Sequence, residues 1–374
     1  MRFMKKSMIY GLFLVVVVFP AVSFAARVSG LYEAEVQVYS QKRSERSLAM
    51  ISALAEVLAK VSGKRDAALA DGVAQAVQKP DRFLQQYRYR ALSDEDRARE
   101  LATAEPGADP QIVLFRFDKA AVDKLLKESG LPVWGSTRPA TLVWLAVEDE
   151  GRQYMVGSES SEPLREQTLQ EAHRRGLAVL LPLMDLEDQA ALRFTDVWGG
   201  NRESIERASR RYSTESILVG RLYRPRGGEW QAQWTLLGER FIQSWRGFGV
   251  LPLELLDSGM AGTLDVLASR YAPAGGQQQE GLLPVTITDV RTLNDYARVT
   301  KYLMSLQQVS HVQIRRIDAD RITFDLDIQG GPESFMTTVS LGNVLAAFKP
   351  LPGDSGKEPA NWSSSYSQVY QLLP

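Results

Sequence analysis

The sequence predicts an α/β (α+β) protein made of three small mixed-sheet domains, at 27–130, 139–272 and 283–349. Short segments in which apolar and polar residues alternate, as in strands, are interleaved with segments of helical periodicity. Stretches rich in Pro, Gly or Gln, at 131–139 and 272–281, separate the three units. A length of 374 residues also exceeds what one hydrophobic core usually organises, so two or three domains are expected.

The first unit is expected to begin with a strand at 31–39, followed by a helix with an apolar stripe from Ile51 to Val61. Gly63 follows that stripe at the position where helices commonly end. The other elements expected in this unit are a helix at 67–77, a strand at 83–92, a surface loop at 93–110, a strand at 112–117 and a helix at 119–129.

The second unit is expected to form around a continuous apolar strand at 141–147, the kind of strand that is buried on both faces of a sheet. Pro163 suits the first position of a helix that ends at Gly176. The other expected elements are strands at 177–181, 217–223, 230–237 and 241–245, and helices at 203–211 and 253–271.

The third unit has the order β-α-β-β-α, which resembles a ferredoxin-like arrangement with helices on one face of the sheet. Its elements are expected at 283–290, 292–306, 309–317, 322–328 and 332–348. Residues 350–374 are rich in Ser, Pro and Gly and are predicted to be a flexible tail.

Residues 1–25 have the layout of a cleavable secretory signal. A basic start precedes an uncharged apolar run at 8–19, and a small-x-small motif ends at Ala25, where cleavage is expected. The run is shorter than the roughly 20 residues that span a bilayer. An uncleaved anchor over 9–26 is the alternative interpretation. The protein is therefore expected in the periplasm, with no transmembrane segment in the mature chain.

Composition excludes several classes of chemistry. The chain has no cysteine, so disulfides, thiolate catalysis, thiolate metal sites and lipid attachment through a thiol are ruled out. The formal net charge is −1, and it becomes −1 − 3 = −4 without the three cations of the leader, which gives no argument for nucleic-acid binding. The sequence has neither a Walker nor a dinucleotide-binding glycine motif, and no cofactor is expected.

Catalytic and metal-binding residues are not expected either. His173 and His311 fall in different predicted domains, and no nucleophile-elbow motif accompanies them. The acidic run 184–188 follows a predicted strand, where carboxylates could bind Ca²⁺. The favoured interpretation is that Asp185 caps the next helix. A hydrolase that uses Asp185 or Asp188 as a base is the least favoured class of function.

Five residues are candidates for binding. Asp196 and Trp198 lie in an expected loop at 196–201, and Arg210 belongs to an arginine-rich helix whose i, i+4 pairs with glutamate also suit a solvated face. Trp230 and Trp234 share one face of a predicted strand. Such an aromatic face either stacks on sugar rings or packs under a helix, and core packing is the favoured interpretation.

Several motifs resemble a known family. The segments 183–189, 196–199, 208–212 and 219–222, together with Tyr32–Val36, are similar to exported bacterial proteins that carry domain of unknown function 2066. The resemblance implies an envelope location and no established activity. Residues 204–237 also look like the small α/β domain of TolB-type and CsgG-type envelope proteins, in which it serves protein–protein contact.

Together these observations predict a non-enzymatic adaptor or assembly factor of the cell envelope that acts through protein contacts. The alternative is a glycan- or peptidoglycan-binding module that uses exposed Trp198, Trp230 and Trp234.

Overall fold

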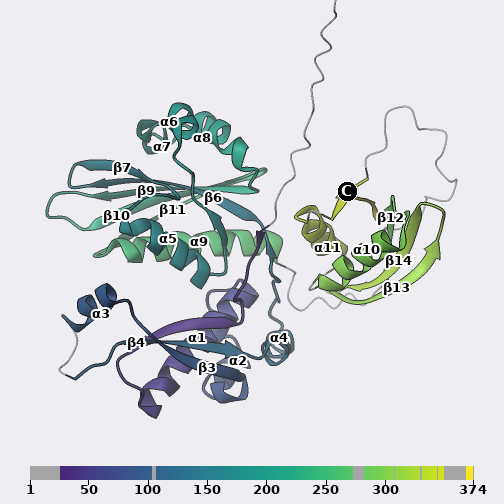
Figure 1. Cartoon of the computed structure of the whole chain (residues 1–374), viewed down its shortest axis with the longest axis horizontal. Helices are drawn as coiled ribbons and strands as arrows, with labels where there is room; N and C mark the ends of the chain where they lie inside the picture. Colours follow the sequence, from purple (N-terminus) through teal and green to yellow (C-terminus); the bar gives the residue numbers. More distant parts are fainter. Residues whose placement is uncertain are drawn as a thin grey trace, which may run out of the picture.

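The computed structural model describes residues 26–102, 107–272, 282–306, 308–328, 331–342, 344–348 and 368–373. Helices and mixed sheets alternate in three units, which confirms the predicted α/β class (Figure 1). The expected leader with Ala25 lies outside the described residues, as do residues 273–281 of the linker expected at 272–281. No helix in the described part of the chain is both long enough and apolar enough to cross a membrane.

The N-terminal unit is an antiparallel three-stranded sheet that packs against a long helix. Its strands have the order β2 (Glu33–Val38), β4 (Gln111–Phe117), β3 (Leu84–Ala91). Helix α1 (Arg43–Ser62) buries its apolar stripe against β2 and β4, and α4 (Lys119–Glu128) adds to the same core. Gly63 ends α1 with φ of 69°, as predicted for a residue in the left-handed region.

Two predictions for this unit are wrong. The helix expected at 67–77 is split into a 3-10 turn, η1 (Ala67–Leu69), and a short α2 (Val73–Val77), because Gly72 between them has φ of 81°. The surface loop expected at 93–110 contains α3 (Asp94–Leu101). Its sequence is rich in Glu and Arg, which are good helix formers. Glu100 of this helix accepts hydrogen bonds from Gln37 and Tyr39, which fastens it to the sheet.

The middle unit is built on a six-stranded sheet. Its order is β11 (Phe241–Gly249), β10 (Trp230–Gly238), β9 (Ser216–Arg224), β6 (Ala140–Asp149), β7 (Arg152–Val156), and β8 (Ala178–Leu180) also pairs with β6. Strand β6 runs parallel to β8 and β9, while β9, β10 and β11 form an antiparallel meander. Residues 140–147 are buried, as the apolar run predicted.

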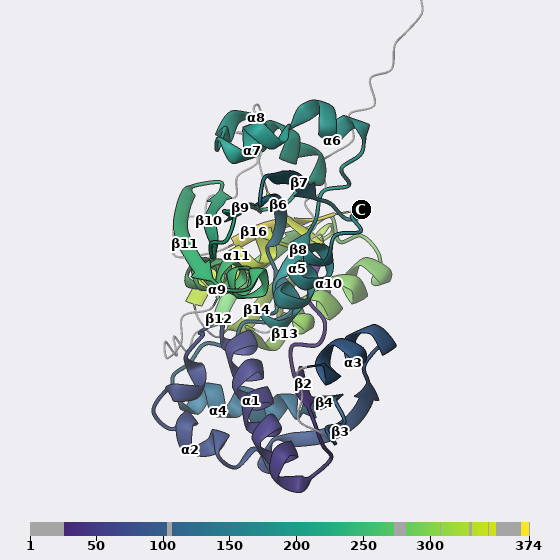
Figure 2. The same ribbon diagram turned by 90° about the vertical axis from the view of Figure 1, so that its left-hand side faces the viewer.

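Helices cover the two faces of this sheet unequally (Figures 1 and 2). Helices α5 (Pro163–Arg174) and α9 (Pro252–Tyr271) lie on one face, and α9 contacts β9, β10 and β11. On the other face α7 contacts β6, β7 and β9, with α8 and α6 beside it. The helices of that second face are α6 (Leu186–Ala191), α7 (Phe194–Trp198) and α8 (Arg202–Ser209), the last followed by η3 (Arg210–Tyr212). The loop expected at 196–201 therefore begins as a helix.

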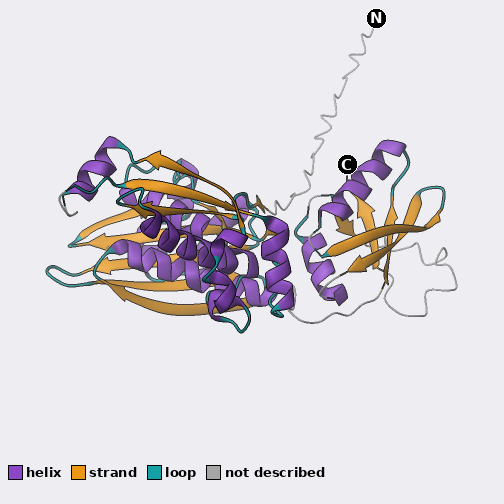
Figure 3. Ribbon diagram, turned by 90° about the horizontal axis from the view of Figure 1, so that it is seen from below, coloured by secondary structure: helices purple, strands orange, loops and turns teal. Residues whose placement is uncertain are grey.

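The C-terminal unit has a five-stranded sheet with α10 (Leu293–Ser305) and α11 (Gly331–Ser340) packed on it (Figure 3). The strand order is β13 (Val309–Ile317), β14 (Arg321–Ile328), β12 (Leu282–Thr288), β16 (Gln368–Leu372), β15 (Leu345–Ala347).

Two corrections concern the end of this unit. The helix expected at 332–348 ends at Ser340, and β15 follows it. The tail expected to be flexible contains β16, which pairs in parallel with β12 and buries Tyr370 and Leu372. The ferredoxin-like order therefore holds from β12 to α11, and the sheet continues with two further strands. The segment 349–367 lies outside the described residues.

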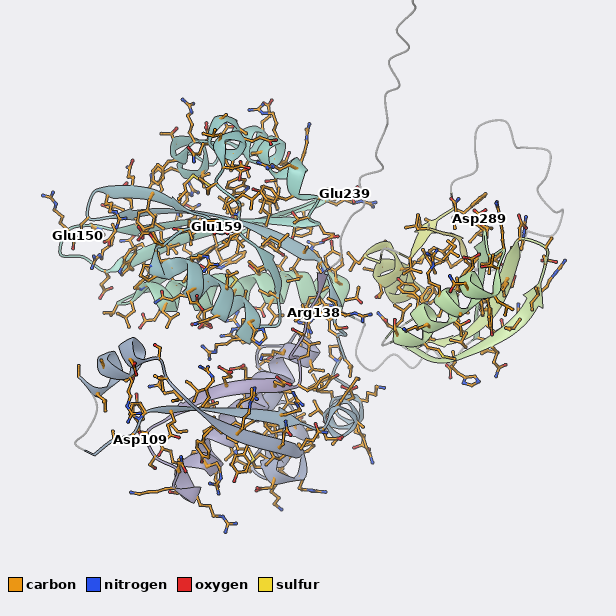
Figure 4. The ribbon with its side chains drawn as sticks, viewed as in Figure 1. Asp109, Arg138, Glu150, Glu159, Glu239 and Asp289 are labelled. Atoms are coloured by element: carbon orange, nitrogen blue, oxygen red, sulfur yellow. The ribbon has the colours of Figure 1, made fainter. Side chains whose placement is uncertain are left out.

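The segment 131–139, which the sequence predicts to be a linker, is packed between the N-terminal and middle units. Val133 and Trp134 are buried, and β5 (Thr137–Arg138) pairs with β1 (Ala26–Arg27). Figure 4 shows Arg138 at the junction of the two units. Its guanidinium donates to backbone carbonyls of both units, Lys60 in the first and Gly176 in the second.

His173 is a titratable group that lies at this junction. The ring lies against Gly30, where an added Cβ would be 3.2 Å from Cε1, and burial followed by the nearby charge of Lys60 lowers the pKa of His173. Glu33, Glu35 and Glu56 raise that pKa to a smaller extent. Because the folded-state pKa lies below that of the unfolded chain, the unfolded chain protonates first as the pH falls. The contribution of His173 to the free energy of unfolding is therefore fully present above the ordinary histidine pKa, and it decreases as the pH falls below that value.

We expect His173→Gln to reduce this loss of stability on acidification just below pH 6.5. Urea unfolding at a series of pH values, for the wild type and the variant, measures the effect. Glu171 has a raised pKa, also from burial, and its contribution has the opposite sign, but it is common to both proteins. Equal pH slopes in the two proteins would contradict the prediction.

Candidate interaction surface of the middle domain

The outer side of β10 and β11 is the part of the middle sheet that α7 leaves uncovered. Side chains that face this side come from alternate positions of three strands, and the pairing places them in rows across the sheet. We call this surface the open face, and its residues are Arg221, Tyr223, Gln231, Gln233, Thr235, Ile242, Ser244, Arg246 and Phe248.

Two apolar side chains are prominent on the open face. Phe248 is 67% exposed and Ile242 is 50% exposed, although both belong to a strand. They lie near opposite ends of β11, with Ser244 and Arg246 between them on the same side. Single exposed apolar residues are common on protein surfaces, and these two share one edge strand beside an uncovered part of the sheet.

Strand β11 is an edge of the sheet. It pairs with β10 on one side, and no strand of the described residues pairs with its other side. An edge of this kind presents unpaired backbone N–H and C=O groups. The opposite face of β11 is anchored, because Trp245 donates to the carbonyl of Ser258 in α9 and packs on the core. The edge is therefore held in an extended, accessible form.

The open face is positively charged next to this edge. Arg221, Gln233 and Arg246 form one row across β9, β10 and β11. Neither arginine forms an ion pair within the described ranges, whereas Arg224 of the same strand β9 pairs with Asp149. Arg221 donates to the carbonyl of Trp198 at 2.7 Å, and burial lowers its pKa.

Acidic groups are remote from this row. Strand β11 contains neither Asp nor Glu. Glu148 lies on the same side of the sheet but on β6, three strands from β11, where it accepts a hydrogen bond from Gln153. Within the part of the sheet that the structure describes, the strand that carries Arg246 therefore supplies no carboxylate to neutralise this row.

Of the three predicted contact residues, Trp198 borders the open face. Its half-buried ring stacks on Phe194 at 5.1 Å and meets Tyr223 edge-on at 6.4 Å. Asp196 is engaged elsewhere, since it accepts from the backbone N–H of Arg193 at the start of α7, and this hydrogen bond lowers its pKa. Arg210 is exposed at η3, and no hydrogen bond or ion pair within the described residues joins it to the open face.

The two strand tryptophans are in the core. Trp230 is 5% exposed and Trp234 is fully buried, and both pack with Ala232 toward α9. The guanidinium carbon of Arg224 also lies over the Trp230 ring, 5.2 Å from the ring centroid. The interpretation as core packing is confirmed, and the glycan alternative loses two of its three exposed rings.

Sequence reasoning missed Arg221, Arg246 and Phe248. Within 241–249, Ile242, Ser244, Arg246 and Phe248 occupy alternate positions, and no acidic residue occurs. That alternation predicts a strand with one solvated side, but the row of arginines appears only with the pairing register of β9, β10 and β11.

The acidic run after β8 is structural. Asp185 accepts from the backbone N–H of Asp188, so the predicted helix cap is confirmed. The hydrogen bond from Arg211 is the main reason that the pKa of Asp185 falls to about 2. Asp188 is buried and accepts from Met184, Arg211 and Tyr212. Both of its oxygens are thus engaged in holding this loop to Arg211 and Tyr212.

The two histidines lie outside the open face. His173 is exposed at the domain junction, and His311 is exposed on β13 of the C-terminal unit. Among the residues with described placement, no three His, Asp or Glu side chains converge in a way that suits a metal ion.

One protein family model matches part of the chain. It is described as a domain of unknown function (DUF8605), and it covers residues 25–135, the N-terminal unit with the start of the buried junction. The match does not reach the motifs of 183–222 that resemble family 2066. No curated protein and no solved structure matches the chain.

Proposed function

We propose that this chain is an exported protein of the cell envelope that binds another protein through the open face and the free edge of β11. It acts as an adaptor or assembly factor and carries out no chemistry of its own. The observation that carries the proposal is an uncovered half-sheet that ends in an accessible edge strand with exposed Ile242 and Phe248.

Export is supported by the sequence. The basic start, the apolar run and the small-x-small motif ending at Ala25 form a three-part secretory leader. The resemblance to exported proteins with domain 2066 favours the same location. Sequencing the N-terminus of the protein from a periplasmic fraction tests this part, and the expected first residue is Ala26.

Protein binding is supported by the way natural sheets treat their edges. Edge strands are usually short, covered, or interrupted by proline or charge, because they otherwise pair with other chains. Strand β11 is nine residues long, lacks proline, and carries a single charged residue, Arg246. An edge retained in this form fits a binding role.

The glycan alternative has weaker support. With Trp230 and Trp234 in the core, Trp198 is the one of the three candidate rings that remains partly accessible. A single half-buried ring that is already stacked on Phe194 offers little area to a sugar.

We expect a photo-crosslinking residue in place of Ser244 to capture a protein when cells are irradiated. The side chain lies at the centre of the open face, so a bound partner must come within its reach. A matched control carries the same residue in place of Gln86, which is exposed on β3, the edge strand of the N-terminal sheet. An adduct at position 244 and none at 86 supports the proposal. If the protein with the crosslinking residue at position 244 forms no adduct after irradiation, the result contradicts the proposed function.

A further inference from the structure

We propose that the open face recognises an extended acidic segment of its partner, which adds to the sheet as a new strand beside β11 and places a carboxylate opposite Arg246. The inference rests on the proposed function and specifies the chemistry of the partner at the same surface.

The backbone of β11 determines the extended form of the ligand. At about 3.4 Å per residue, the nine residues of β11 offer about 30 Å of edge. A peptide strand satisfies the free N–H and C=O groups of such an edge, whereas a folded surface or a lipid headgroup does not. Because α9 already fixes β11 from the other face, little ordering is required of the receptor.

The side chains of β11 determine the sequence pattern of the ligand. Every second residue of an added strand faces Ile242, Ser244, Arg246 or Phe248. Antiparallel pairing is slightly more stable than parallel pairing. In that orientation, alternate residues of the ligand, counted from its N-terminus, lie opposite Phe248, Arg246, Ser244 and Ile242. The complementary pattern is apolar, acidic, small polar and apolar, at positions 1, 3, 5 and 7.

Charge distinguishes an acidic partner from a second copy of this chain. Arg246 contacts the added strand directly, and Arg221, two strands further in, adds to the positive potential along the same row. A second copy of β11 would bring its own arginine and no carboxylate to the contact. Such a copy therefore offers Arg246 no countercharge. An acidic segment is the partner that this row favours.

The test uses the purified chain from residue 26 and two fluorescent peptides of equal composition. The first is a heptapeptide with leucine, glutamate, threonine and isoleucine at positions 1, 3, 5 and 7, and serine or threonine between them. The second has the glutamate moved to an even position. We expect the first peptide to bind at least fivefold more tightly than the second. Hydrogen exchange is expected to show new protection confined to 241–249.

Charge variants make the test specific. Arg246→Glu is expected to weaken binding of the first peptide about five- to tenfold, and a peptide with lysine in place of glutamate is expected to recover it. Arg88→Glu is the matched control, since Arg88 is an exposed arginine on the edge strand β3 of the other unit, and it is expected to leave affinity unchanged.

Three outcomes of the peptide test would overturn the inference: equal binding of the two peptides, equal binding by the wild type and Arg246→Glu, or protection elsewhere in the chain.

Other occupants of the surface would also be recognised. Dimerisation of the wild type that protects 241–249 without peptide would assign the edge to a second copy instead. Binding to phosphatidylglycerol vesicles that depends on Arg246 without protection of β11 would assign the face to a membrane. If neither peptide binds while the crosslinking residue at position 244 still captures a protein, the proposal of an acidic added strand is refuted, and the proposed function stands.

Discussion

Replacing Arg138 by methionine is expected to lower the free energy of unfolding by about 3–5 kcal/mol, since it leaves several buried carbonyls without a donor. Arg138 is 1% exposed. Its guanidinium donates to the carbonyls of Lys60 and Gly176 at 2.6 Å each, and to those of Trp134 and Gly135 at 3.0 Å. Methionine keeps much of the volume but supplies none of these hydrogen bonds.

The position of these acceptors explains why a cation is needed. The carbonyl of Lys60 lies in the last turn of α1, and that of Gly176 lies just beyond the end of α5. Carbonyls at helix C-termini lack intrahelical partners and carry partial negative charge. The ring of Trp134 lies 4.2 Å from the guanidinium carbon and adds a cation–π contact. Burial lowers the pKa of Arg138 to about 9, so the group remains charged at neutral pH.

Urea unfolding followed by circular dichroism measures the loss. Arg88→Met is the control, because Arg88 is exposed on β3, and surface substitutions usually change stability by less than about 0.5 kcal/mol. Hydrogen exchange in Arg138→Met should rise at β1, β5 and the end of α1, where the two units meet. A loss of stability similar to that of the control would show that the guanidinium does not hold the junction.

Local patterns were sufficient for much of the fold. Strand β6 was predicted from its continuous apolar run, and the end of α1 from Gly63, because burial on both faces and a left-handed C-terminus leave a mark in adjacent residues. Helix α3 was missed because it is highly charged and buries little, so it lacks the apolar stripe on which the prediction depended.

Other features depend on partners distant in sequence. Strand β16 is five residues long, and it pairs with β12 and β15, between which it lies in the sheet. Arg138 stands among Thr, Pro and Gly in a segment typical of a linker, and its burial follows from two helix ends that lie 38 and 78 residues away. For the same reason the sequence could single out Trp198, which borders the open face, but could not bring Arg221 and Arg246 into one row.

Trp234→Ala is expected to lower stability by about 3–5 kcal/mol, as for other buried aromatic residues cut to alanine. The indole is fully buried and lies between two glycines, Gly220 of β9 and Gly259 of α9. A Cβ at position 259 would lie 2.5 Å from Cε2 of the ring, and one at position 220 would overlap the ring from the other side. The two glycines therefore make the space that the tryptophan fills, and this contact joins the sheet to α9 beneath the candidate surface.

A double-mutant cycle tests this complementarity. Gly259→Leu alone is expected to lower stability by about 1–3 kcal/mol through overpacking, even though leucine is the better helix former. In the Trp234→Ala background the leucine side chain instead enters the space that the ring has left. The double variant should then be more stable than the sum of the single losses predicts, by at least about 1 kcal/mol. Additive losses would mean that the ring and the glycine are not coupled. Trp234→Phe should cost less than Trp234→Ala, because no group among the described residues accepts a hydrogen bond from the indole Nε1.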